Sequence, residues 1–381
     1  MSDYLTGEPG GPGTAPPQPR APLPSRRRGG GAAHGDDAAD GGAGATGGLA
    51  ALLLAEAHRF SARRFIRWLL GLAVLGYVVV VPLVGITQFA RTTDDVRAQA
   101  RAEIARIVAD QNAYRTQCLA TPVPPEAGEG TTAEEWCGPA TSGEDLRVED
   151  FLPKQPFVLA DYLQPGAVAV GVAVAALFFV VGATWIGAEW SARTMMALLF
   201  WETRRLRVLA TKTAVLVAVT AVVAVLAQLA WAGSAWLIAS TRGSTGPLPK
   251  GFWGDVAALG GRTVLLAVLT ALLGMGVAHL IRSTGAALGV GFVYFAVVEN
   301  AVGAVRPGWR EWLLTTNAAA LVVKGGVPIA VPGTTVDSGS GQIVEFTEKN
   351  ISNLHGGLVI GAVALLLLGV GGWLFRRRDL T

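Results

Sequence analysis

Charged residues are scarce in this 381-residue sequence: only 15% are Asp, Glu, Lys or Arg, against 51% hydrophobic residues. That balance is too apolar for an ordinary soluble domain. The net charge is only +3, and the arginines stand beside apolar runs, as residues that set membrane topology do. The composition therefore excludes a soluble domain and argues against nucleic acid as a partner.

Cysteine and histidine are also rare, with two and four residues respectively. Neither residue type shows the spacing of a metal site, so we expect no metal ligands. The Gly-rich N-terminus lacks the Gly-Lys-Ser/Thr ending of a phosphate-binding loop, and no such loop occurs elsewhere. The sequence accordingly predicts no catalytic residues, no cofactor and no ATPase in this chain.

Long apolar runs are what the sequence does contain, and runs of about 20 residues are long enough for a helix to cross a bilayer. We predict an all-α membrane protein with about six transmembrane helices, at residues 68–89, 167–186, 214–238, 264–281, 286–305 and 357–375. Residues 312–331 are apolar too, but Asn317, Lys324 and Pro328 interrupt them. We therefore do not count them as a span, and a re-entrant or interfacial segment is the alternative.

The segments between the spans differ in charge and in composition. Residues 1–47 are rich in Gly, Pro and Ala and predict a disordered cytoplasmic tail, followed by a transmembrane domain over 48–381. Basic clusters precede the first span and follow the second and the last, whereas residues 91–165 carry more acids than bases. By the positive-inside rule both termini are cytoplasmic, 91–165 is an extracellular lobe and 306–355 an extracellular loop.

Two amphipathic helices are predicted outside the spans. Residues 49–64 combine Ala and Leu with basic residues toward the end, which favours a helix lying in the inner membrane interface. Residues 94–118 place apolar side chains at helical spacing among charges, which predicts a helix within the extracellular lobe.

The two cysteines, Cys118 and Cys137, both fall in the predicted lobe, where oxidation is allowed. A disulfide between them would close a loop of about 20 residues and add roughly 3 kcal/mol to the stability of the lobe. Sequence alone leaves the pairing open, because a disulfide requires a short distance between the two Cα atoms.

The stretch that follows the second span carries the most informative pattern. Glu189 and Thr194 precede a Leu-rich turn, Arg205 comes next, and an Ala-Thr-Lys ending places Lys212 last. This order resembles the signature of the membrane subunits of ABC-2 type transporters. Arg193 stands where that family usually has Gly, and Thr203 stands where it usually has Pro.

The resemblance covers about residues 49–381. It implies a permease of the plasma membrane that works with a separate cytoplasmic ABC ATPase subunit, which would bind ATP and Mg²⁺. It also implies an exporter that pairs with a second permease subunit, as a homodimer or heterodimer, within the lipid bilayer. Charged and aromatic side chains of the stretch would contact the ATPase. These residues are Glu189, Trp190, Arg193, Thr194, Arg204, Arg205 and Lys212. The alternative is that they only set the topology of the helix ends.

Glu299 and Asn300 are polar residues inside the fifth predicted span. An acid in that position is costly unless it faces protein or water. Glu299 could line a substrate path or hold a neighbouring helix by a hydrogen bond, and both interpretations stay open. Gln228 in the third span is interpreted as a contact between helices.

Two other functions remain as alternatives to a permease. One is a membrane-anchored scaffold or sensor that uses the extracellular lobe, although six spans are more than anchoring requires. The other is an ion-coupled secondary transporter with Glu299 as its ionisable site, which would be driven by a gradient rather than by ATP.

Overall fold

A computed structural model describes residues 43–91, 93–124, 128, 130–192, 205–337 and 342–377. Residues 48–381 form one compact unit, separate from residues 1–47, and the description below concerns that unit. Of the disordered tail predicted at residues 1–47, residues 1–42 lie outside the described residues.

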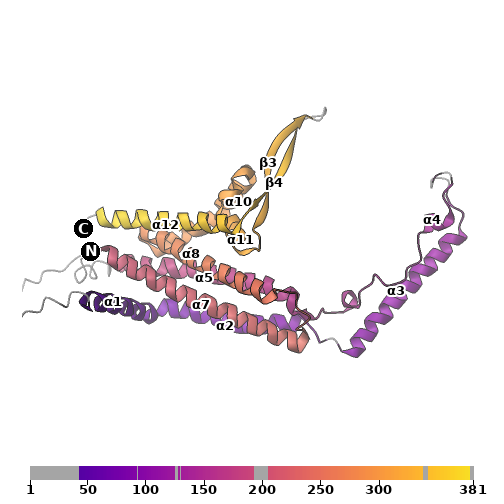
Figure 1. Cartoon of the computed structure of the whole chain (residues 1–381), viewed down its shortest axis with the longest axis horizontal. Helices are drawn as coiled ribbons and strands as arrows, with labels where there is room; N and C mark the ends of the chain where they lie inside the picture. Colours follow the sequence, from indigo (N-terminus) through magenta and orange to yellow (C-terminus); the bar gives the residue numbers. More distant parts are fainter. Residues whose placement is uncertain are drawn as a thin grey trace, which may run out of the picture. The chain divides into compact units, whose positions relative to one another are not determined.

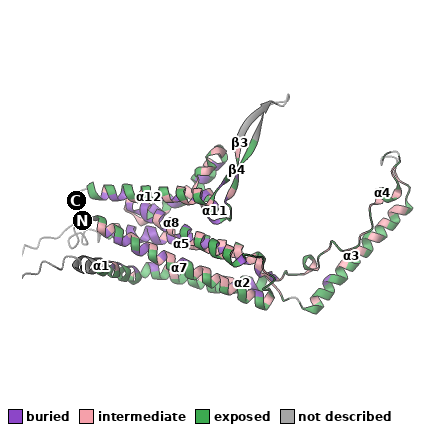
Figure 2. Ribbon diagram, viewed as in Figure 1, coloured by how far each residue is buried: buried purple, intermediate pink, exposed green. Residues whose placement is uncertain are grey.

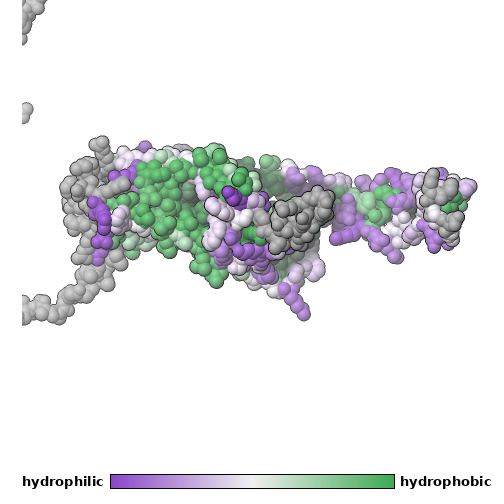
Figure 3. All heavy atoms as spheres, turned by 90° about the horizontal axis from the view of Figure 1, so that it is seen from above, coloured by the Kyte–Doolittle hydropathy of each residue, from purple (hydrophilic) through white to green (hydrophobic). Residues whose placement is uncertain are grey.

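Within the described residues, six helices are long and apolar enough to cross a membrane, as predicted. They are α2 (Arg64–Gln88), α5 (Leu159–Ser191), α7 (Arg205–Arg242), α8 (Phe252–Ile281), the stretch Thr284–Val305 and α12 (Asn353–Arg377). The stretch Thr284–Val305 is built from α9 (Thr284–Val293), the π-helical turn η3 (Tyr294–Val298) and α10 (Glu299–Val305). Figure 3 shows the hydrophobic surface (green) that these helices expose. The chain is thus a multi-pass membrane protein.

Helices α5 and α8 form the centre of the bundle and touch each other through their backbones. A Cβ atom added to Gly182 of α5 would lie 2.1 Å from the carbonyl oxygen of Ala271, and one added to Gly274 of α8 would lie 2.1 Å from that of Phe179. Small residues permit this close approach, which supplies van der Waals contact inside a membrane. Both α7 and α12 pack against α8 (Figure 1).

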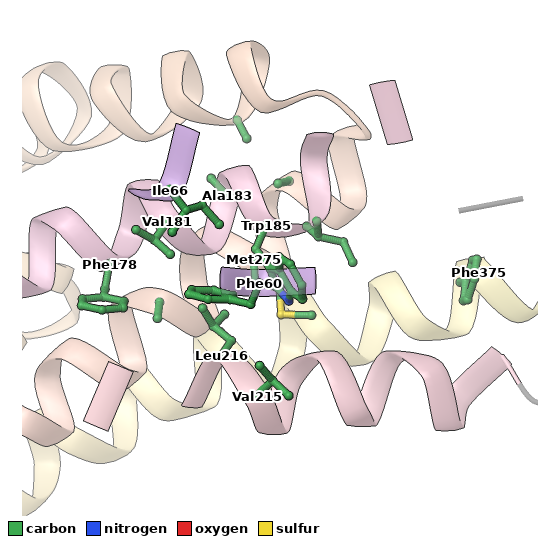
Figure 4. Close-up of a cluster of buried hydrophobic side chains, with 14 residues drawn as sticks. Phe60, Ile66, Phe178, Val181, Ala183, Trp185, Val215, Leu216, Met275 and Phe375 are labelled. Carbon is green, nitrogen blue, oxygen red and sulfur yellow. The ribbon is translucent and has the colours of Figure 1, made fainter. Parts of the chain in front are cut away.

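Buried apolar side chains gather where α1 (Ala43–Ala62) meets α5, α7 and α8. Figure 4 shows Phe60, Trp185, Leu216 and Met275 in this cluster, and none of them is more than 4% exposed. Because these side chains come from four helices, the cluster joins the predicted interfacial helix to the spans.

Helix α2 is far more exposed than the central helices (Figure 2). Only 6% of its most apolar window is buried, against 50% for α8. Its contacts with α7 include a hydrogen bond of 2.9 Å between the hydroxyls of Tyr77 and Ser234, and Gly85 lies against Ile238. Most of its surface is therefore available to lipid.

The segment between α2 and α5 contains the predicted amphipathic helix, α3 (Asp94–Ala120), followed by the short α4 (Ala133–Cys137) and η2 (Val148–Phe151). Thr132 and Glu135 form a capping box at the start of α4, and hydrogen bonding from the backbone N–H and then the side chain of Thr132 lowers the pKa of the Glu135 carboxyl. A disulfide joins Cys118 at the end of α3 to Cys137, with the Cα atoms 5.9 Å apart.

The all-α prediction is wrong in the loop 306–355. This loop contains η4 (Pro307–Trp312), α11 (Leu314–Val322) and an antiparallel hairpin of β3 (Val327–Asp337) and β4 (Gln342–Ile351), paired from Val327 opposite Ile351. A second, two-residue parallel pair joins β1 (Phe157–Val158) to β2 (Gly243–Ser244). The segment 312–331 is thus part η4, part α11 and part strand, and α11 packs against α12 and α8.

Several helices extend beyond the predicted spans. Residues 167–186 are the apolar centre of α5, which starts at Leu159 and continues through Pro165, and residues 214–238 are the centre of α7. Polar residues end an apolar run without ending the helix, because a helix can extend beyond the hydrocarbon layer into the interface.

Candidate functional site

The residues of the predicted partner contact divide into those that the structure describes and those outside the described residues. Glu189 and Trp190 lie in the last turn of α5, and Lys212 lies two turns into α7. Arg205 is the first residue of α7. Arg193, Thr194 and Arg204 lie outside the described residues.

Lys212 is the centre of a buried ion-pair network. Its side chain has no exposed surface, and its Nζ lies 2.7 Å from Oε2 of Glu56 and 2.8 Å from Oε1 of Glu189. These carboxylates belong to α1 and α5, and their side chains are 5% and 9% exposed. One ammonium group from α7 therefore joins two other helices, and Glu189 and Lys212 are buried among them.

Two arginines extend the network toward the surface. Nη2 of Arg63 donates to Oε1 of Glu189 at 2.6 Å, and Nη1 of Arg59 donates to Oε1 of Glu56 at 2.8 Å. Arg63 has an extended backbone conformation and separates α1 from α2. Its side chain therefore fixes the junction between the two helices onto the end of α5.

The ring of Trp185 packs against both inner cations of the network. The guanidinium carbon of Arg63 lies 4.6 Å from the ring centroid, and Nζ of Lys212 lies 4.7 Å from it. The Trp185 indole N–H donates to the carbonyl oxygen of Lys212 at 3.4 Å, and Phe60 meets the ring edge to face at 5.0 Å. Cation–π attraction is strongest where the cation has lost its water, as the fully buried Lys212 has.

The pairing of charges in the network suits it to hold helices together. Three cations surround two carboxylates, so every buried charge has a partner of opposite sign, as buried charges require. Among the described residues no group of three or more His, Cys, Asp or Glu side chains could hold a metal ion. What the arrangement can do is hold α1, α5 and α7 in one relative position.

Sequence reasoning missed the role of Glu56, Arg63 and Trp185 in this site. The sequence held one signal of this role: Glu56 is an acid within an interfacial helix whose other charged residues are basic. Its partner Lys212 is 156 residues away, so only the packing of the helices brings the two together.

Trp190 is held by a second cluster beside the network. Its indole Nε1 donates to Nδ1 of His279 at 3.3 Å, and its ring meets that of Phe375 at a centroid distance of 5.7 Å. His279 belongs to α8 and Phe375 to α12, so the cluster ties the ends of α5, α8 and α12 together.

Glu299 is only 4% exposed and binds the beginning of α11. Its carboxylate accepts hydrogen bonds from the backbone N–H of Thr315 at 3.1 and 3.2 Å and from the Thr315 hydroxyl. Asn300 is exposed and donates to backbone carbonyls of its own helix. Of the two interpretations of Glu299, the geometry thus favours the hydrogen bond to a neighbouring element, and Asn300 does not join it.

Gln228 makes the predicted contact between helices. Its Nε2 donates to the carbonyl oxygen of Ala167 at 3.1 Å, which joins α7 to α5.

The ends of the spans differ in charge. At the end that contains the network, which we call the basic end, the described acids are Glu56 and Glu189. The described basic residues there are Arg59, Arg63, Arg64, Arg67, Arg205, Arg207, Lys212, Arg282, Arg376 and Arg377. The segment that joins the opposite ends of α2 and α5 carries most of the acids of the unit. Such an asymmetry is typical of a multi-pass membrane protein with an oriented insertion.

The fold and these sites define a six-span membrane protein with a buried ionic junction at one end. Comparison of the chain with protein families, with characterised proteins and with solved structures finds no match.

Proposed function

We propose that the chain is the permease subunit of an ATP-binding-cassette transporter of the ABC-2 type, which exports a substrate across the plasma membrane. The chain would work as a homodimer or heterodimer with separate cytoplasmic ATPase subunits. The six apolar helices support a membrane role, and the stretch from Glu189 to Lys212 supports the choice of family.

One observation carries the proposal: the two ends of that stretch meet in space. Glu189 and Lys212 stand 23 positions apart in the sequence, yet their charged atoms lie 2.8 Å apart. The same ammonium also binds Glu56 of α1. Displacement of the connection between α5 and α7 would therefore pull directly on the interfacial helix.

The proposed mechanism uses this rigid junction to transmit motion. A partner ATPase that closes on ATP would move residues 193–204, which connect α5 to α7. Because the ion pairs hold α1, α5 and α7 together, these helices would move as a body and alternate the access of a path between two permeases. Cytoplasmic termini agree with this scheme, since the basic end would then face the cytoplasm.

The first test is purification of the full chain in mild detergent from the membranes of its own host, followed by mass spectrometry of the proteins that accompany it. We expect an ABC ATPase in an amount comparable with that of the chain. Its absence from the preparation, after mild cross-linking in the membrane as well, would refute the permease proposal.

The second test reverses charge in the connecting stretch, with Arg204→Glu combined with Arg205→Glu. We expect at least about tenfold less ATPase to be retained, because rim charges that change sign oppose association. The matched control is Arg376→Glu with Arg377→Glu, which reverses two charges at the same end of the bundle. Equal retention by both double variants would remove the docking role from residues 204 and 205.

A further inference from the structure

The exposed face of α2 carries two arginines and a tryptophan where the helix begins, at the basic end. Arg64, Arg67 and Trp68 stand at positions i, i+3 and i+4 of the helix, so they share one face. All three are exposed, and Trp68 is 77% exposed. The next turns of the same face carry the exposed residues Gly71, Leu72 and Leu75. We call this surface, from Arg64 to Leu75, the Arg64 face.

The junction between α1 and α2 turns the Arg64 face away from the ionic network. Arg63, just before α2, binds Glu189 at 2.6 Å. Ile66, in the first turn of α2, is only 1% exposed and belongs to the buried apolar cluster of the bundle. Residues two positions apart on a helix point to opposite sides. The burial of Ile66 therefore directs Arg64 and Trp68 outward.

Arg64 and Arg67 have no counter-ion in the described part of the chain. None of the ion pairs between described residues includes either of them. The two acids described at the basic end, Glu56 and Glu189, are already paired with cations of the network. A cation beside the hydrocarbon layer is costly unless an anion or water meets it. Both guanidinium groups are therefore open to an anion from outside the protein.

The Arg64 face changes from cationic to aromatic to apolar along α2. Trp68 follows the arginines, and tryptophan is typical of the level of the lipid headgroups. A Cβ atom added to Gly71 would meet no atom within 4 Å, so the surface is open at this position. The exposed side chains of Leu72 and Leu75 come next. A phospholipid has the same order, with its phosphate first, then its glycerol esters and then its acyl chains.

We infer that the Arg64 face binds an anionic phospholipid of the leaflet at the basic end. Two guanidinium groups within one turn of a helix can both donate to one phosphate, with the bidentate geometry that arginine favours. The acyl chains would lie on Gly71, Leu72 and Leu75. A lipid with net negative charge is favoured over a zwitterionic one, because a choline group would bring a further cation toward the two arginines. The inference requires no ATPase partner and so stands apart from the proposed function.

A second copy of the chain fits the Arg64 face less well than a lipid does. In a two-fold contact the same residues meet each other, so the arginines of both copies would come together. Like charges that face each other oppose association. A lipid phosphate instead supplies the charge that Arg64 and Arg67 lack.

The experiment measures which lipid the full chain retains. The purified chain in detergent is mixed with equal amounts of phosphatidylglycerol and phosphatidylcholine that carry the same acyl chains. Native mass spectrometry then compares the two species that hold one lipid. We expect phosphatidylglycerol to be preferred at least about tenfold, which is what one additional charge-assisted hydrogen bond provides. Equal retention of the two lipids would overturn the inference.

Two double variants assign the preference to the Arg64 face. Arg64→Gln combined with Arg67→Gln should lower the preference about tenfold. The matched control is Arg97→Gln with Arg101→Gln, which removes two exposed arginines of α3 and the same total charge, and which should keep the preference. A preference that persists without Arg64 and Arg67, or that falls equally in both variants, would also overturn the inference.

Thermal unfolding in detergent provides a second readout. Without added lipid, both double variants should unfold at the same midpoint as the unaltered chain, because the replaced side chains are exposed. Phosphatidylglycerol should raise the midpoint of the unaltered chain, because it binds the folded state, and should raise that of Arg64→Gln with Arg67→Gln less. An equal rise in both would contradict a lipid site. A loss of dimers in this variant with an unchanged lipid preference would assign the face to a second copy and refute the inference.

Discussion

Replacing Lys212 by Met would remove the central cation of the buried network while keeping a side chain of similar length. Lys212 is fully buried, and the side chains of Glu56 and Glu189 are 5% and 9% exposed. Their two carboxylates would then face each other with no cation between them. Breaking a buried ion pair on one side costs about 3–5 kcal/mol, because the remaining charge stays buried without its partner.

The lower part of that range applies here, because each carboxylate keeps one arginine. Glu56 retains Arg59 at 2.8 Å and Glu189 retains Arg63 at 2.6 Å. We therefore expect a loss of about 3 kcal/mol in the free energy of unfolding. For a unit of this size, that loss lowers the midpoint of thermal unfolding in detergent by on the order of 4 °C.

A second variant distinguishes the loss of the ion pair from the loss of packing. Adding Glu56→Gln to Lys212→Met removes one of the stranded charges, so at least about 1 kcal/mol should return relative to the sum of the two single variants. The control is Lys324→Met, whose ion pair with Asp255 is exposed and should be worth about 0–1 kcal/mol. Strict additivity, or equal losses in Lys212→Met and Lys324→Met, would refute the reasoning.

Two further predictions concern packing and the disulfide. Gly182→Leu should lower the free energy of unfolding by about 3 kcal/mol or more, because even its Cβ would meet a carbonyl oxygen of α8 at 2.1 Å. The control Gly261→Leu has open space around it and should change the stability very little. Thermal unfolding in detergent compares the two variants. Cys118→Ser opens a loop with a sequence separation of 19 and should destabilise the lobe by about 3 kcal/mol. Hydrogen exchange should then accelerate in α3 while the amides of α5 and α8 stay protected, and equal acceleration in all three would contradict a local role.

The six spans could be predicted from the sequence because a bilayer demands about 20 apolar residues in each, and that demand acts on every span separately. The hairpin of β3 and β4 could not. Pro328 and Pro332 interrupt its first strand, and proline usually argues against a strand. In a hairpin of two strands, however, each strand has an open edge, where a residue without an N–H group is tolerated.

The candidate site was predicted in its residues but not in its geometry. Glu189 and Lys212 were predicted to contact a partner ATPase, which stays a prediction, and the structure buries both in one ion-pair network. Their burial depends on Glu56, a residue of another helix, and no spacing within the sequence encodes that meeting. A local pattern can identify charged residues, whereas the partner of each charge is decided by how the helices pack.

The exposure of α2 has a consequence for the order of biogenesis. This helix is made before the other spans, and only 6% of its most apolar window is covered by protein. It can therefore reside in lipid alone while the long segment that follows is synthesised. Helix α8, half buried and carrying Thr263 and His279 inside, needs α5 already in place when it leaves the insertion machinery. Of α2 and α8, the helix that is made first is thus the one that depends less on its neighbours.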